Sequence, residues 1–109
     1  MIDNKDYDAV EIINIHECFS DKRLFIDDCN HIDFHRCLNG YIHIDEVVIE
    51  DKVMFRCLVN ALVKYAEDNL CTSIIYDGRK ETDVVLFFYE YGFTVEGVDN
   101  YNICLKKIL

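Results

Sequence analysis

The dipeptide Asn39-Gly40 constrains the fold of this chain more than any other local signal. It is favoured in tight hairpin turns whose two central residues both take positive φ values. The segments on its two sides, residues 31–38 and 41–49, alternate polar and apolar side chains for much of their length, as half-buried strands do. The sequence therefore predicts an antiparallel hairpin over residues 31–48, with Asn39-Gly40 in its turn.

The segments around this hairpin predict further strands and a long helix. Upstream, residues 9–15 and 24–26 have the composition of strands, with a turn through residues 20–23 between them. Downstream, residues 51–69 show the apolar period of a helix packed on a sheet, and Asp51 is a suitable N-cap. The apolar stripe of this helix consists of Val53, Met54, Cys57, Leu58, Ala61, Leu62, Tyr65 and Ala66.

The remaining segments complete the sheet. Residues 72–76 predict a strand, residues 79–91 a second helix that ends at Gly92, and residues 93–98 and 101–109 two last strands. Because the long helix is a crossover connection, we expect the strand at residue 72 to lie parallel to its neighbour. The predicted fold class is α/β (α+β), with a single mixed, mostly antiparallel sheet and two main helices. Residues 1–109 are expected to form one domain.

Charge and cysteine usage narrow the expected environment and partners. Acidic residues outnumber basic ones 21 to 11, for a net charge of −10, and basic residues occur at most in pairs. This surface disfavours nucleic acid but not a basic protein. The chain has no apolar stretch of about 18 residues and a polar, acidic N-terminus, so we expect neither a membrane span nor a signal peptide. The six cysteines are scattered singly, which predicts free thiols and a cytoplasmic location.

The histidines and carboxylates are candidate catalytic or metal-binding groups. Of the four histidines, His16, His31, His35 and His43, the second and third lie about 13 Å apart on an extended strand, too far to share an ion. Neighbouring pairs such as Cys29/His31 or Asp33/His35 lack an evident third ligand. The carboxylates of residues 45–51 are typical of a helix N-terminus, and no local signature supports a Cys/His nucleophile. We therefore predict no metal site and no catalytic residue.

The order of elements, with Tyr91-Gly92-Phe93 after the second helix, resembles the later two-thirds of the Gcn5-related acetyltransferase (GNAT) fold. In that family a glycine-containing loop opens the long helix, and its N–H groups and the helix dipole hold the coenzyme A diphosphate. The corresponding residues 49–56 contain no glycine and carry Glu50 and Asp51, whose charges oppose a diphosphate. The tyrosine acid of the family is replaced by Phe88. We therefore expect no cofactor, no small-molecule substrate and no enzymatic activity.

Within this fold, residues 31–109 also resemble the core of ornithine decarboxylase antizyme, a non-catalytic protein that captures decarboxylase subunits. Matching segments at residues 41–45, 64–70 and 88–95 occur in the same order and with similar spacing. In that family a basic residue early in the long helix contacts the decarboxylase, and Arg56 occupies this position. Two other positions differ, with Lys64 in place of a glutamate and Glu96 in place of a hydrophobic residue.

The resemblance implies a catalytically inert, antizyme-like inhibitor or adaptor, with ornithine decarboxylase as a candidate partner. Two alternatives stay open: a non-catalytic factor docked on a large assembly such as the ribosome, and a minimal coenzyme-A-dependent acyltransferase. The expected partner is a protein or a protein-rich assembly. The predicted protein-binding residues follow the exposed face of the long helix and the end of the second: Lys52, Arg56, Asn60, Lys64, Tyr89, Tyr91 and Glu96.

Overall fold

The computed structural model describes residues 14–18 and 21–109. This part of the chain forms a seven-stranded sheet in the order β1-β2-β3-β4-β5-β7-β6. Five of the six neighbouring pairs are antiparallel and β4/β5 is parallel, so the predicted mixed sheet with two main helices is confirmed. The elements are β1 (Asn14–Cys18), β2 (Asp21–Asp27), β3 (Asn30–Arg36), β4 (Tyr41–Val48), α2 (Lys52–Asp68), β5 (Ser73–Arg79), α3 (Asp83–Tyr91), β6 (Thr94–Val98) and β7 (Asn102–Ile108).

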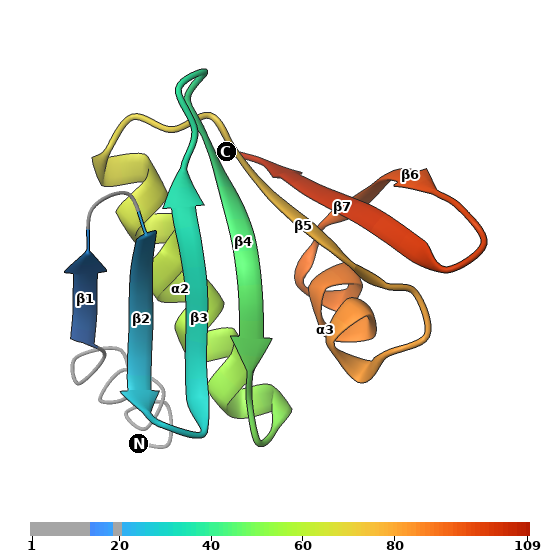
Figure 1. Ribbon diagram of the computed structural model, residues 1–109, viewed down its shortest axis with the longest axis horizontal. Helices are drawn as coiled ribbons and strands as arrows, with labels where there is room; N and C mark the ends of the chain where they lie inside the picture. The colour runs from blue at the N-terminus through green and yellow to red at the C-terminus, as the bar shows by residue number, and fades with distance from the viewer. Residues whose placement is uncertain (1–13, 19–20) are drawn as a thin grey trace.

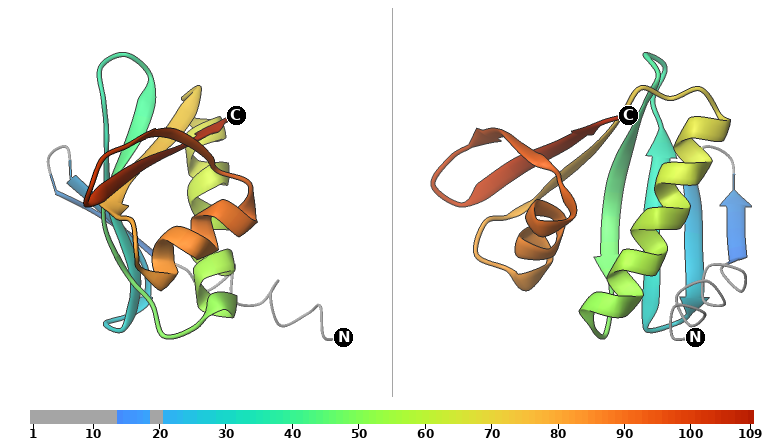
Figure 2. Two further views of the ribbon diagram at one scale, coloured as in Figure 1. Left: turned by 90° about the vertical axis from the view of Figure 1, so that its right-hand side faces the viewer. Right: turned by 180° about the vertical axis from the view of Figure 1, so that it is seen from behind.

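Both helices cover the same face of the sheet (Figures 1 and 2). The core lies between them and the inward side chains of β3, β4, β5 and β7, where Phe34, Ile44 and Leu105 are fully buried. From α3, Phe88 packs edge-on against Phe55 of α2, at 4.8 Å between ring centroids. Among the described residues no helix covers the opposite face, which we call the helix-free face.

The predicted hairpin is confirmed, but its turn differs from the expected type. Gly40 has a φ of 84°, whereas Asn39 is not among the residues with positive φ. The Gly40 N–H donates to the Cys37 carbonyl at 3.1 Å, and the Cys37 N–H donates to the Tyr41 carbonyl at 2.8 Å. The loop is therefore a type I turn followed by a glycine bulge, which requires only one left-handed residue.

Helix α2 is confirmed together with its cap, since the Asp51 side chain accepts a hydrogen bond from the Met54 N–H at 2.9 Å. Its buried face is wider than the predicted stripe. Phe55 and Val59 are fully buried, while Val53 is 55% exposed. The reason is the second helix, because the aromatic side chains of α3 cover a part of α2 that a sheet alone would leave open.

Two predicted boundaries are wrong. Residues 77–79 continue β5, which pairs with β7 as far as Arg79↔Asn102, so α3 begins at Asp83 and not at residue 79. Residues 21–23 belong to β2 and not to a turn, since they pair with both β1 and β3. Most of the strand predicted over residues 9–15, and residue 20 of the predicted turn, lie outside the described residues.

The thiols agree with the expectation as far as they are described. Cys57 is 1% exposed and packs in the core as a small apolar side chain. Five cysteines are free thiols: Cys29, Cys37, Cys57, Cys71 and Cys104. The Cys18 side chain lies outside the described part. Neither described helix is long and apolar enough to cross a membrane.

Candidate functional site

The parallel strands β4 and β5 separate partway along their length. Their pairing covers four residues on each strand and ends at Ile44↔Tyr76. Beyond this point β4 continues to Val48 and β5 continues to Arg79, and the two strands diverge as Figure 1 shows. Residues 77–79 pair with β7 on their other side. In the described part of the chain, the backbone of β4 after Ile44 therefore has no partner strand on its β5 side, although β4 lies inside the sheet.

A β-bulge lies at the same point of β4. Phe34 pairs with Ile44 and Asp33 pairs with Glu46, so Asp45 is one extra residue on β4. A bulge bends its strand and changes the direction of its side chains. Here it places two consecutive carboxylates on the helix-free face: Asp45 contacts His35, and Glu46 lies near Asp33, which is two residues from His35 on the same strand.

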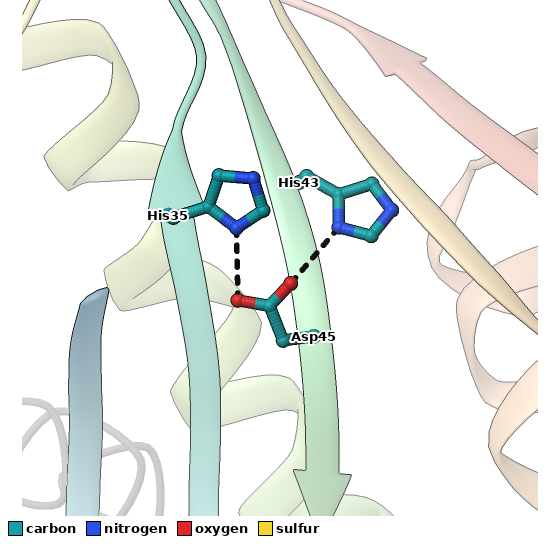
Figure 3. Close-up of side chains that lie close together, drawn as sticks. All are labelled: His35, His43 and Asp45. Atoms are coloured by element: carbon teal, nitrogen blue, oxygen red, sulfur yellow. Dashed lines mark hydrogen bonds and ion pairs between the residues drawn. The ribbon is translucent and has the colours of Figure 1, made fainter. Parts of the chain in front are cut away.

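A chain of hydrogen bonds crosses three strands on the helix-free face. Asp45 bridges two imidazoles: its carboxylate oxygens lie 2.9 Å from Nδ1 of His35 and 3.1 Å from Nδ1 of His43 (Figure 3). The other ring nitrogen of His43, Nε2, lies 3.0 Å from the carboxylate of Asp77 on β5. We call these four residues the His–Asp network. The His–Asp network crosses from β4 to β5 at the point where these two strands separate.

The electrostatics of this network favour a protonated His43. Partial burial lowers the pKa of its imidazole, but hydrogen bonds to Asp77 and Asp45 and the charges of both carboxylates raise it. The net effect is a pKa above the ordinary value of histidine. His35 and His43 also lie side by side, with ring centroids 5.3 Å apart.

A second group of polar side chains lies beside the network. His31, Asp33 and Glu46 bring their nitrogen and oxygen atoms within 4.8 Å of one another. The guanidinium of Arg23 donates to both oxygens of Asp33, at 2.6 and 3.0 Å. His31 is only 6% exposed, and within residues 14–18 and 21–109 neither of its ring nitrogens has a hydrogen-bond partner. Such unsatisfied buried groups are uncommon and destabilising.

An open hollow of about 860 Å³ extends over β2, β3 and β4 on this face. Acidic side chains predominate in its lining, which suits a positively charged ligand. The lining residues are Asp21, Lys22, Arg23, Phe25, Asp27, Asp28, Asp33, Phe34, His35 and Asp45.

On the helix-covered side of the same strand separation lies Tyr76. Its ring stacks on Phe88 of α3, with a centroid distance of 4.5 Å and an interplanar angle of 25°. The ring extends along β5 over Gly78, where a Cβ atom would come within 2.5 Å of the tyrosine hydroxyl. The hydroxyl therefore lies beside the part of β5 that has left β4. Burial raises the pKa of Tyr76, which keeps the phenol protonated at neutral pH.

The N-terminus of α2 directly follows the free end of β4, and both of its acidic residues have local structural roles. The Asp51 carboxylate caps the helix. The Glu50 carboxylate accepts a hydrogen bond from the side-chain Nδ2 of Asn30 at 3.0 Å, and the Glu50 N–H donates to the side-chain Oδ1 of Asn30 at 3.0 Å. Lys52 lies 2.8 Å from Glu90 and over the Phe87 ring, so its ammonium group is held between α2 and α3.

The predicted protein-binding residues are exposed or partly exposed, and several contact one another or their neighbours. The Tyr91 hydroxyl donates to the Asn60 side chain, and Lys64 lies 3.6 Å from Asp68. Tyr89 is 61% exposed, and Arg56 and Glu96 are exposed. Burial raises the pKa of Tyr91, while the nearby charge of Arg56 lowers it. That this surface binds a protein stays a prediction.

Sequence reasoning missed the network because its members come from three strands. His35 was considered only with residues of its own strand, and Asp45 only as a carboxylate near the helix N-terminus. The predicted two-residue turn would have paired His35 with Ile44, whereas the observed three-residue loop shifts the register by one residue and pairs His35 with His43. Asp77 and the bulge at Asp45 had no sequence signal.

Comparisons with known proteins identify the fold. No family model matches the sequence, and no curated protein matches it. Forty chains of solved structures do match. The PaiA N-acetyltransferase of Thermoplasma acidophilum, in complex with coenzyme A, superposes with a TM-score of 0.68 at 15% identity over 82% of this chain. This chain spans 60% of the length of that protein.

Two further solved structures superpose on this chain in the same way. The Campylobacter jejuni N-acetyltransferase PseH, in complex with acetyl coenzyme A, has a TM-score of 0.64 at 16% identity, covering 84% of this chain and 70% of its own. An inferred acetyltransferase from Agrobacterium tumefaciens has a TM-score of 0.68 at 14% identity, covering 99% and 85%. The chain therefore has the fold of the GNAT acetyltransferases, as expected from its order of elements.

These findings correct three expectations. The expectations of no enzymatic activity and of no small-molecule substrate are wrong, because the matching structures are acetyltransferases and two of them hold coenzyme A or acetyl coenzyme A. The antizyme resemblance and the inhibitor function that it implied receive no support from any of the three comparisons. The acyltransferase alternative agrees better with the matches. The single domain and the cytoplasmic location stay predictions.

Proposed function

We propose that this protein is a small acyltransferase that takes an acyl group from an acyl-coenzyme A and transfers it to an amine. The observation that carries this proposal is the separation of β4 and β5 after Ile44↔Tyr76, in a fold whose solved examples include coenzyme A complexes. The unpaired β4 backbone offers N–H and C=O groups to an extended ligand that contains amides. The pantetheine arm of coenzyme A is such a ligand.

The residues around this opening fit coenzyme A in part. The N-terminus of α2 provides a helix dipole for the diphosphate, and Lys52 supplies a positive charge beside it. The surface ion pair of Lys52 with Glu90 is weak enough for a diphosphate to replace it. The fit lacks the glycine loop of the family, and Glu50 and Asp51 add negative charge. Since both carboxylates are hydrogen-bonded within the protein, neither needs to face the diphosphate.

Tyr76 is the residue we assign as the proton donor. When an amine attacks a thioester, the C–S bond breaks and the leaving sulfur gains a proton. The Tyr76 hydroxyl lies over Gly78, where the strands have parted, and burial keeps it protonated. It is stacked on Phe88, the position where the family has its tyrosine. A tyrosine on the neighbouring strand would thus perform the role that Phe88 cannot.

The acceptor amine would approach from the helix-free face. The carboxylates of Asp45 and Asp77 lie there at the strand separation, and the acidic hollow adjoins them. A chain with a net charge of −10 attracts cationic amines to this face. A cationic amine loses one proton before it attacks and a second as the amide forms. Both leave to solvent, because this face is open, and solvent returns one proton to Tyr76.

The test combines binding and turnover. We expect isothermal titration with acetyl-coenzyme A to show saturable binding, and thiol release to accelerate with a panel of amines that contains free lysine, a diamine and a short peptide. Tyr76→Phe should lower kcat about 100-fold or more and leave the Kd for acetyl-coenzyme A within about twofold. Tyr101→Phe, which changes an exposed tyrosine in the turn before β7, is the matched control.

Two results would overturn the proposal. Absence of binding at 1 mM acetyl-coenzyme A, roughly the upper end of ordinary substrate affinities, would remove the donor site. Equal turnover by Tyr76→Phe and the parent protein would remove the assigned proton donor.

A further inference from the structure

We propose that His35, His43 and Asp45 bind a divalent transition-metal ion on the helix-free face, with Asp77 orienting His43 from behind. No metal site was expected from the sequence, because the histidines of one strand are too far apart to share an ion. The structure supplies the missing ligands from the neighbouring strand. His35 and His43 are direct partners in the β3/β4 register, and the bulged residue Asp45 follows His43 on the same face.

The candidate ligand atoms converge on a small volume. The Nδ1 atoms of both imidazoles lie within 2.9 and 3.1 Å of the Asp45 carboxylate, as Figure 3 shows. One ligand atom from each residue lies within 4.8 Å of the others. A tetrahedral ion with bonds of about 2.0–2.1 Å places its ligand atoms roughly 3.4 Å apart. Side-chain rotations that shorten the longest separation by at most about 1.4 Å would complete three-fold coordination.

Asp77 gives this arrangement the outer carboxylate that metal-binding histidines ordinarily have. Its oxygen lies 3.0 Å from Nε2 of His43, on the side of the ring opposite to Asp45. An ion would replace the proton on Nδ1 of His43, while the proton on Nε2 stays donated to Asp77 and holds the Nδ1 side of the ring toward Asp45. Carboxylate–histidine–metal arrangements of this kind fix the tautomer and strengthen the ligand.

Ligand chemistry and access favour an ion of the zinc type. Two imidazoles with one carboxylate suit Zn²⁺, Co²⁺ or Ni²⁺, whereas Ca²⁺ and Mg²⁺ prefer oxygen ligands. The three side chains are between 29% and 38% exposed, which leaves a route for the ion and a position for water. Nearby acidic side chains, including Glu46, attract a cation.

The neighbouring group of His31, Asp33 and Glu46 is the natural comparison on the same face. It too brings three ligand atoms within 4.8 Å. However, both oxygens of Asp33 are held by Arg23, and an ion would have to displace this bidentate pair. The His31 group therefore serves as the control site.

The experiment uses the full chain after removal of metal with a chelator, and Zn²⁺ and Co²⁺ as the probes. We expect calorimetry to show one Zn²⁺ per chain, and Co²⁺ to give the visible absorption of a tetrahedral or five-coordinate complex. His43→Asn and Asp45→Asn should each weaken binding at least about 100-fold, and Asp77→Asn about 10- to 100-fold. His31→Asn and Cys29→Ser should leave the affinity unchanged.

The proposal fails if His43→Asn keeps the parent affinity, or if His31→Asn or Cys29→Ser abolishes binding, since either result places the ion elsewhere. It also fails if 1 mM Co²⁺ produces no visible band. Circular dichroism establishes that each variant is folded. Because no acyl donor is present, the outcome is independent of the proposed acyl transfer.

Discussion

At the scale of single residues, the helix-free face contains one histidine with both ring nitrogens satisfied and another with neither. His43 is hydrogen-bonded to Asp45 and Asp77, and both contacts raise its pKa. His31 lies on the adjacent strand β3 and is 6% exposed, and neither of its nitrogens has a hydrogen-bond partner among the described residues. Burial alone therefore does not distinguish a structural histidine from a functional one; the contacts of the ring do.

His31 gives the first prediction at this scale. A buried polar group without a partner costs roughly 1–3 kcal/mol, so His31→Leu should raise the free energy of unfolding by about 1 kcal/mol. Urea denaturation in chelator-treated buffer measures the change. The corresponding His43→Leu should lower stability, because it removes one hydrogen bond from Asp45 and one from Asp77. A loss of stability in His31→Leu would show that the His31 ring has a favourable contact.

The thiol of Cys104 gives the second prediction at the scale of single residues. Burial raises the pKa of its thiol to about 11, together with a hydrogen bond to Asp77 and the charges of Asp77 and Glu96. Only about 0.1% is thiolate at pH 8, so alkylation should be slow there and accelerate about tenfold per pH unit towards pH 11. Peptide mapping after iodoacetamide treatment would compare it with the exposed Cys29. Equal labelling of both at pH 8 would contradict this assignment, and Asp77→Asn should increase the rate at Cys104.

At the scale of elements, local sequence patterns predicted the helices, the hairpin and most of the helix ends, which depend on interactions between residues close in the sequence. The hairpin, both helices, the cap at Asp51 and the C-terminal Gly92 were found, because periodicity and turn chemistry act over a few residues. The start of α3 was missed, since residues 77–79 join β5 through pairing with β7 at residues 102–104, about 25 residues away along the chain. Phe55 was missed because its burial depends on a helix that follows later.

The hairpin turn offers a prediction with an internal control. Gly40 has a φ of 84° and no atom within 4 Å of an added Cβ, so any cost of Gly40→Ala comes from the backbone alone. We expect a loss of about 1–2 kcal/mol. Gly97 is equally open and has no left-handed φ, so Gly97→Ala should change stability by less than about 0.5 kcal/mol. Thermal or urea unfolding of both variants measures the difference, and equal effects would contradict the strain at Gly40.

At the scale of the whole molecule, the candidate site lies where β4 and β5 separate, and groups from both faces of the sheet surround it. The helix-covered side supplies Tyr76 and the N-terminus of α2, while the helix-free face supplies the His–Asp network and the acidic hollow. The sequence analysis singled out most of these residues but did not predict that they lie close together. Side-chain neighbours across β3, β4 and β5 depend on register and on the strand separation, which no local pattern sets.

Because of the bulge at Asp45, the polar character of the helix-free face depends on the number of residues in β4 as much as on their types. One extra residue on β4 directs both Asp45 and Glu46 to the helix-free face. A substitution at either position would remove one carboxylate but leave the bulge and the direction of the other carboxylate unchanged. Deleting Asp45 would restore strict alternation, keep Glu46 on the helix-free face and Val47 on the core face, and remove the carboxylate that joins the two imidazoles. Homologues should therefore be aligned here by insertions and deletions before residue identities are compared.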